Sequence, residues 1–238
     1  MKIIAHRGYR ALFPENTILS FLKAMEYGAD GIELDVRMSR DGVPVIAHDP
    51  FIFDKTNPNN AFIISETDLK MLKKIPLGMN QTIPTLKEVL ESIDESIFID
   101  VEFKIPDVIP RSIDMLKYFG FKNLMFSSFK RSSLKNLKEV FPSAVIGLLY
   151  EVYELEEINQ LYDFLISEFK NYSADFLNLP VEFFRNRTYL LEIIEKVKKA
   201  GIKVSFWTVN ELEDLNLIRD ITDILITDEV ELMINHIR

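Results

Sequence analysis

The segment GIELDV at residues 31–36 is one of a series of short apolar runs that alternate along the chain with amphipathic stretches. The stretches between the runs place apolar residues three and four positions apart, as at Ile18, Phe21, Leu22 and Met25, which is the spacing of one helix face. This order predicts strands that are each followed by a covering helix. The candidate strands are IIA at 3–5, GIELDV at 31–36, IFIDVEF at 97–103, LMFSS at 124–128, AVIGLLY at 144–150, DFLNLP at 175–180, KVSFWTV at 203–209 and DILIT at 223–227.

Strict alternation of buried strands and covering helices implies a parallel sheet, and eight such units close into a barrel. We therefore predict the α/β class and a (β/α)8 TIM barrel. The main rival is a doubly wound open sheet. The turn after the first strand reads GYRALFP at 8–14 and lacks the G-x-G-x-x-G pattern of a dinucleotide fold, so this rival has little support.

Local signals for helix ends agree with this division. Thr85 with Glu88, and Asn210 with Glu213, have the spacing of capping boxes. Gly201 lies where the preceding helix should end. These positions predict helix starts near residues 85 and 210.

The 238 residues are predicted to form one barrel domain, residues 1–238, because α/β barrels use about 200 to 250 residues as one unit. One stretch interrupts the alternation of strands and helices. About 35 residues separate VPVIAHD at 43–49 from the helix near Thr85, with a short helical piece at 68–74 between them. An excursion of this length is typical of a lid or a binding loop. We expect a lid-like insertion at about residues 50–84.

Composition narrows the possible partners. The 28 basic and 37 acidic residues give a net charge of −9 without a basic block, so nucleic acid is not an expected partner. The absence of cysteine excludes disulfides, thiolate catalysis and sulfur-ligated metals. The chain opens without a signal-like segment and has no apolar run of about 18 residues, so we expect a soluble, cytoplasmic protein without stable membrane association. The oligomeric state is left open.

Two of the three histidines fall at the carboxyl ends of predicted strands. They are His6 and His48, and in a barrel this is the edge where active sites are assembled. A single histidine at such a position is more often structural, so the pair is the informative feature. His236 lies three residues from the end in a polar segment and is not expected to take part.

Acidic residues on two predicted strands are spaced so that they share a face. Glu33 and Asp35 are two positions apart, as are Asp100, Glu102 and Lys104 on the next strand. In a closed barrel that face is the interior, where unpaired carboxylates cost several kcal/mol, roughly. A divalent cation would offset this cost, and oxygen ligands favour Mg²⁺, Ca²⁺ or Mn²⁺ over zinc. The alternative is a network in which Lys104 and Arg7 neutralise the acids without metal.

Several of these motifs together resemble one known family, the glycerophosphodiester phosphodiesterases, in their order and spacing. The resemblance is close over roughly the first 105 residues and returns near the end of the chain. The motifs are His6-Arg7-Gly8, Glu15-Asn16-Thr17, GADGIELDVRMSRDGVPVIAHDP at 28–50, IPTLKEVL at 83–90, VEFK at 101–104, SFWTVN at 205–210 and ITDEVEL at 226–232.

The resemblance implies roles for residues at the strand ends. His6 and His48 would be the general acid and base, without a decision as to which is which. The metal ligands would be Glu33, Asp35 and Glu102, holding one divalent cation, Mg²⁺ or Ca²⁺ with Mn²⁺ as a further choice.

The resemblance also implies a phosphate-binding pair, Arg7 and Lys104, and two further pocket residues, Asn16 and Trp207. Each of the last two has a structural alternative from its position alone. Asn16 fits the N-cap of a helix, and Trp207 fits a packed strand end.

The implied substrate is a small-molecule glycerophosphodiester, such as glycerophosphocholine or glycerophosphoethanolamine, which is hydrolysed to glycerol 3-phosphate and an alcohol. One alternative is a phospholipase-type phosphodiesterase acting on an intact lipid, because the segment 51–64 carries several apolar residues that could form a rim. A less favoured alternative is a barrel that binds a phosphate ligand without turnover.

Overall fold

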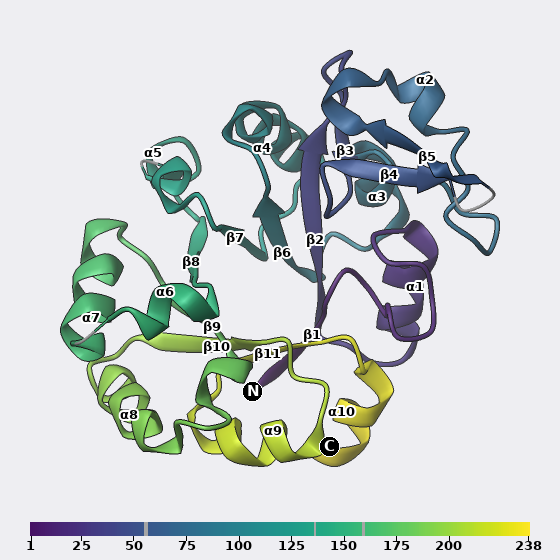
Figure 1. Cartoon of the computed structure of the whole chain (residues 1–238). Coiled ribbons are helices and arrows are strands. Elements are labelled where there is room, and N and C mark those ends of the chain that lie inside the picture. The colour runs from purple at the N-terminus through teal and green to yellow at the C-terminus, as the bar shows by residue number, and fades with distance from the viewer. Residues whose placement is uncertain (55–56, 136, 159) are drawn as a thin grey trace.

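The chain folds around a closed barrel of eight parallel strands, as predicted (Figure 1). The computed structural model describes residues 1–54, 57–135, 137–158 and 160–238. All eight candidate runs form barrel strands. They are β1 (Lys2–Ala5), β2 (Gly31–Met38), β6 (Phe98–Phe103), β7 (Leu124–Ser128), β8 (Val145–Leu149), β9 (Phe176–Pro180), β10 (Lys203–Trp207) and β11 (Ile224–Thr227).

Strand β1 closes the barrel because it pairs in parallel with both β2 and β11. An open doubly wound sheet would leave two free edges, so the rival fold is excluded. Helices surround the barrel in Figure 1. They are α1 (Ile18–Glu26), α3 (Leu86–Ser92), α4 (Ile109–Tyr118), α5 (Leu137–Val140), α6 (Val152–Glu156), α7 (Leu161–Asn171), α8 (Leu191–Lys199), α9 (Leu212–Ile218) and α10 (Val230–Ile237).

The register between β2 and β6 places the acidic residues of the two strands beside one another. Glu33 is paired with Asp100, and Asp35 with Glu102. Paired residues of neighbouring strands point to the same face. All four carboxyl groups are buried, so the barrel interior carries a concentrated negative charge near its carboxyl-terminal end.

The segment between β2 and α3 contains a small structure of its own beside the barrel (Figure 1). Strand β3 (Pro44–Ile46) runs antiparallel to β2, and β4 (Phe51–Asp54) forms a hairpin with β5 (Asn57–Ile63). Helix α2 (Leu69–Leu72) follows and is shorter than the expected piece at 68–74. The description of the chain as one domain with a lid-like insertion stays a prediction.

The predicted helix caps have different outcomes. Thr85 and Glu88 form the expected capping box at the start of α3, and Gly201 follows the end of α8 with a φ of 86°. The box expected at Asn210 and Glu213 is wrong, because the N-cap of α9 is Glu211 and no side chain caps the helix. Asn210 has different hydrogen-bond partners, which belong to the candidate site.

No helix in the described part of the chain is long and apolar enough to cross a membrane.

Candidate active site

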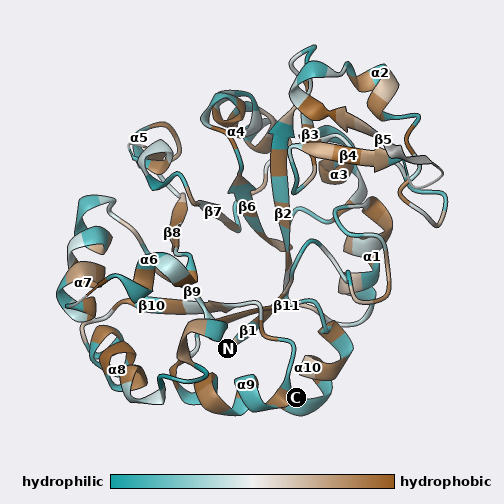
Figure 2. Ribbon diagram, in the orientation of Figure 1, coloured by the Kyte–Doolittle hydropathy of each residue, from teal (hydrophilic) through white to brown (hydrophobic). Residues whose placement is uncertain are grey.

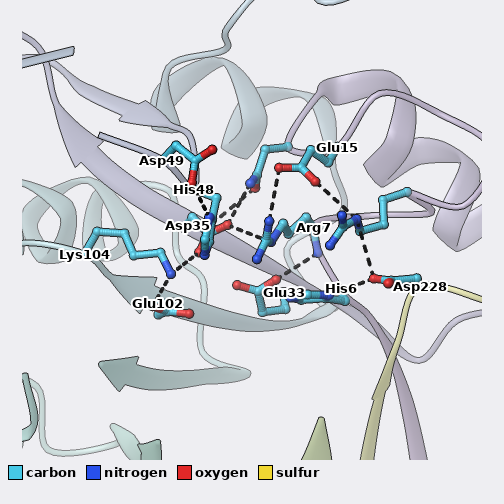
Figure 3. Close-up of polar contacts among 12 residues, drawn as sticks. His6, Arg7, Glu15, Glu33, Asp35, His48, Asp49, Glu102, Lys104 and Asp228 are labelled. Atoms are coloured by element: carbon cyan, nitrogen blue, oxygen red, sulfur yellow. Dashed lines mark hydrogen bonds and ion pairs between the residues drawn. The ribbon is translucent and has the colours of Figure 1, made fainter. Parts of the chain in front are cut away.

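Residues at the carboxyl ends of most barrel strands line one cavity, and Figure 3 shows several of them from β1, β2 and β6. The cavity has a volume of about 140 Å³. His6 follows β1, Glu33 lies on β2, and Glu102 and Lys104 lie at the end of β6. His48 reaches the same cavity from the segment after β3. The two histidines therefore face a common space with Glu33, Asp100 and Glu102, whereas Asp35 does not line it but has an oxygen within 4.8 Å of ligand oxygens of Glu33 and Glu102.

The buried carboxyl groups around this cavity resist ionisation because water cannot solvate them. Burial raises the pKa of Glu33 well above its usual value, and the neighbouring Asp35 carboxylate adds to the shift. Burial likewise raises the pKa of Glu102 to about 7. It raises the pKa of Asp100 to about 8, although Ser127 donates a hydrogen bond of 2.7 Å to that carboxyl group.

Two cations form ion pairs with the acidic cluster. Nζ of Lys104 lies 2.9 Å from Oδ1 of Asp35 and also pairs with Glu102. Nε of Arg7 lies 3.3 Å from Oδ2 of Asp35. Burial alone would raise the pKa of Asp35, but Lys104 and Arg7 outweigh it and hold that pKa below its usual value. Ion pairs with Lys104 and Arg7 therefore suffice to stabilise Asp35 in its ionised form, as expected for a network without metal.

Glu33 is less well compensated. Its Oε2 accepts a hydrogen bond of 2.8 Å from the backbone N–H of Arg7, whereas its buried Oε1 has no hydrogen-bond partner among the described residues. Glu33, Asp35 and Glu102 each offer a ligand oxygen, and these atoms lie within 4.8 Å of one another. An all-oxygen donor set of this kind suits a hard divalent cation. The donor set and the bare oxygen fit such a cation better than they fit ion pairing alone.

His6 is oriented by an acidic residue from the other end of the chain. Its Nδ1 lies 2.7 Å from Oδ1 of Asp228, which follows β11 (Figure 3). Asn210 donates from Nδ2 to the second oxygen of Asp228 at 2.8 Å, and the Asp228 backbone N–H donates back to Asn210 at 2.9 Å. Burial lowers the pKa of His6, and the hydrogen bond with Asp228 opposes that shift.

His48 is more exposed than His6 and is held mainly through its backbone. Its carbonyl oxygen accepts two hydrogen bonds from the Arg37 guanidinium, at 2.8 Å and 2.6 Å. The ring nitrogen Nδ1 lies 2.9 Å from Oδ1 of Asp49. Burial lowers the pKa of His48, and the Asp35 carboxylate opposes the shift. Each of the two histidines thus has its own carboxylate partner.

Asn16 and Trp207 also lie at the site. Asn16 is not a helix cap, because Thr17 is the N-cap of α1. The Asn16 amide instead donates to Oδ2 of Asp35 at 2.7 Å, and the residue takes a left-handed φ of 54°. Trp207 lines the same cavity as His6 and His48 and donates from Nε1 to the carbonyl oxygen of Asn178 at 3.1 Å. It is therefore both a packed strand end and a wall of the cavity.

Comparison with known proteins places this barrel in a family. The model of the glycerophosphoryl diester phosphodiesterase family matches residues 6–232. The chain belongs to this family. It is accordingly an enzyme, a phosphodiesterase, as the resemblance of its motifs implied.

Members of the glycerophosphoryl diester phosphodiesterase family resemble this chain over its whole length. A glycerophosphodiester phosphodiesterase from Caldanaerobacter subterraneus subsp. tengcongensis is 35% identical over 99% of this chain and 97% of its own length. The crystal structure of a glycerophosphodiester phosphodiesterase from Thermotoga maritima has a TM-score of 0.83 and 33% identity, and covers 99% of this chain and 98% of its own. A phosphodiesterase from Oleispira antarctica, solved in complex with the product sn-glycerol-3-phosphate, has a TM-score of 0.84 and 27% identity, and covers 100% and 96%.

The polar residues of this site that were not selected from the sequence as site residues include Arg10, Glu15, Asn210 and Asp228. Glu15 pairs with Arg7 at 3.1 Å and with Arg10 at 3.1 Å, and Arg10 in turn approaches Asp228 at 3.7 Å. Asp228 directly follows the last barrel strand, which is the same signal that selected His6. A search for polar residues directly after each predicted strand would therefore have selected Asp228 after β11.

Proposed function

We propose that this enzyme hydrolyses glycerophosphodiesters to glycerol 3-phosphate and an alcohol, with His6 and His48 as general acid and base. One observation carries the proposal. The two histidines line a single small cavity together with Glu33 and Glu102 of the buried acidic cluster, and Figure 3 shows these side chains. The product named for the Oleispira antarctica structure supports the same substrate class.

Hydrolysis of a phosphodiester needs one proton removed from a nucleophilic oxygen and one delivered to the departing oxygen. Burial lowers the pKa of both histidines, which favours the neutral imidazole that a general base needs near neutral pH. While the neutral histidine takes a proton from the nucleophile, the other histidine, in its protonated form, can deliver a proton to the leaving alcohol. His6 and His48 together can therefore perform both transfers without a third acid or base.

Glu33, Asp35 and Glu102 are proposed to hold one divalent cation, Mg²⁺, Ca²⁺ or Mn²⁺. When bound, such a cation stabilises negative charge on phosphoryl oxygens and lowers the pKa of a hydroxyl group next to it. Lys104 and the guanidinium of Arg7 adjoin these carboxylates and are proposed to attract the phosphate. The residues of the site would thus reverse the net negative charge of the chain where an anionic substrate must bind.

The glycerol part of the substrate carries a hydroxyl group next to the phosphorylated carbon. If that hydroxyl attacks first, the alcohol leaves and a cyclic phosphate forms, which water then opens in a second step. The first step forms one P–O bond and breaks another: the neutral histidine takes the proton of the attacking hydroxyl, and the other histidine, protonated beforehand, gives its proton to the leaving alcohol. The roles reverse in the second step, which restores both protonation states. A rapid-quench experiment should then show a transient cyclic phosphate, and its absence at all times would favour direct attack by water.

The identity of the products tests the proposed reaction. Purified enzyme with a divalent cation should convert glycerophosphocholine to glycerol 3-phosphate and choline, and glycerophosphoethanolamine to glycerol 3-phosphate and ethanolamine. Release of glycerol and phosphocholine would mean that the opposite P–O bond is cleaved, and it would contradict the proposal. A folded enzyme that cleaves neither diester with any of the three cations would contradict it as well.

A further inference from the structure

A second, larger hollow adjoins the catalytic cavity on the side of the β4–β5 hairpin. It has a volume of about 620 Å³, more than four times that of the catalytic cavity. His48 lines both spaces. We propose that this hollow binds the alcohol part of the diester and is built for an alcohol that carries an apolar alkyl chain. The inference rests on the proposed function and adds the class of leaving group.

The sizes of the two spaces divide the substrate between them. The catalytic cavity of about 140 Å³ is small beside the roughly 300 to 1,000 Å³ of ordinary ligand pockets, whereas the larger hollow lies within that range. A diester has two substituents on one phosphorus. With the phosphoryl group beside His48, one substituent can enter each space. The three-carbon glycerol part fits the smaller cavity, which the charged residues Glu33, Glu102 and Lys104 line in part, so a longer alcohol would enter the larger hollow.

Exposed apolar side chains from three separate segments form much of the wall of the hollow. Leu12 precedes α1, Phe51 and Phe53 lie on β4, and Met79 lies between α2 and α3. Their exposed fractions are 52%, 39%, 49% and 57%, respectively. Figure 2 shows the hydrophobic colouring of β4. Large apolar side chains that remain exposed around one hollow indicate a binding surface.

The alternation along β4 shows that these aromatic rings are not the core of the hairpin. Ile52 is buried in a small core with Ile64 and Leu72, and its neighbours Phe51 and Phe53 point to the opposite face. The two rings contact each other edge to face, with centroids 5.1 Å apart. The rings of Phe51 and Phe53 are therefore not part of this small core and stay exposed at the wall of the hollow, which the buried Ile52 borders as well.

The polar residues that line the hollow are linked by hydrogen bonds or ion pairs to residues of the candidate active site. Asn16 is bonded to Asp35, and Arg10 is linked through Glu15 to Arg7. Apart from these and the His48–Asp49 pair, the wall is largely apolar. A ligand that is charged at the phosphate and apolar beyond it would match this division. A choline or ethanolamine group would leave the apolar wall in contact with water.

The test compares glycerophosphodiesters of ethanol, butanol and octanol, at concentrations where each is monomeric, with the cation-loaded enzyme. Each methylene group that enters the hollow should raise kcat/KM by up to about fourfold, since burial of a methylene contributes about 0.8 kcal/mol. The variants Met79→Gln and Phe53→Gln should lower the octyl-to-ethyl ratio at least about fivefold. Met71→Gln is the matched control, because Met71 is 44% exposed on α2 but lies outside the hollow. It should keep the ratio of the wild type.

Calorimetric binding of octyl phosphate and ethyl phosphate gives a second readout that needs no turnover. Tighter binding of octyl phosphate that Met79→Gln weakens would support the hollow even if no diester were hydrolysed, in which case only the proposed function fails. Equal kcat/KM for ethyl and octyl diesters would overturn the inference and leave the proposed function standing. A third outcome would also overturn it: equal kcat/KM for the two diesters, together with binding of the enzyme to phosphatidylcholine vesicles that is lost in Phe53→Gln. The apolar face would then contact a membrane surface.

Discussion

Nδ1 of His6 lies 2.7 Å from Oδ1 of Asp228, although the two residues are 222 positions apart in the chain. Strands β1 and β11 are neighbours in the closed barrel, which brings the residues after them together. A carboxylate at this distance fixes which ring nitrogen carries the proton and leaves the other nitrogen for chemistry. Asp228 is thus a positioning residue for His6, and it depends on barrel closure.

Replacement of Asp228 by Asn tests this relationship. The hydrogen bond with Asp228 raises the pKa of His6 against the stronger effect of burial, so Asp228→Asn should lower that pKa further. The limb of the pH–rate profile that belongs to His6 should move toward lower pH, and kcat should fall by about tenfold or more. Asp220→Asn, an exposed change near the same end of the chain, is the control. A lower rate with an unmoved profile would indicate a structural role alone.

The neighbouring residues Asn16 and Thr17 should separate function from helix capping. Asn16→Gly keeps the left-handed backbone that Asn16 adopts but removes its hydrogen bond to Asp35, so cation affinity should fall by about 10- to 100-fold. Thr17→Ala removes the N-cap of α1 and should cost about 1 kcal/mol of stability. Cation titrations and urea unfolding of both variants measure the two effects. Unchanged cation affinity in Asn16→Gly would contradict the role assigned to its side chain.

Gly8 marks a close approach between the first loop and α1. It has a φ of 79°, and an added Cβ would lie 2.3 Å from Oγ and 2.7 Å from the backbone carbon of Ser20. Gly8→Ala should therefore lower the free energy of unfolding by at least about 2 kcal/mol, through backbone strain and overpacking. Gly201→Ala is matched in φ, at 86°, but an added Cβ meets nothing within 4 Å, so it should cost only about 1 kcal/mol. Equal losses in urea unfolding would refute the argument.

A divalent cation should stabilise the fold as well as support catalysis, because the buried carboxylates repel one another without it. At a concentration about 100 times Kd, the cation should add about 2.7 kcal/mol, which raises Tm by about 5 °C or more. Glu33→Gln removes one buried acid and should lose most of that increase while remaining folded without metal. A thermal scan of chelator-treated protein that does not respond to Mg²⁺, Ca²⁺ or Mn²⁺ would favour the metal-free ion-pair network.

The hydrophobic pattern and the spacing of charged residues along the chain predicted the barrel strands and the side on which their side chains lie. Eight apolar runs became the eight barrel strands, and the two-residue spacing of Glu33 and Asp35 placed both carboxylates inside. The expected capping box at Asn210 was wrong because that side chain bonds to Asp228, a tertiary contact that local spacing does not encode. The apolar residues of 51–64 were visible in the sequence, but the hollow that they border was not, since its wall joins segments whose contacts only the folded chain sets.

The most direct test of the central claim is release of glycerol 3-phosphate from glycerophosphocholine by chelator-stripped enzyme, before and after addition of Mg²⁺, Ca²⁺ or Mn²⁺. The account predicts little release without a cation, recovery with at least one of the three, and loss of that recovery in Glu33→Gln. Full release by the stripped enzyme, unchanged by added cation and by Glu33→Gln, would contradict it.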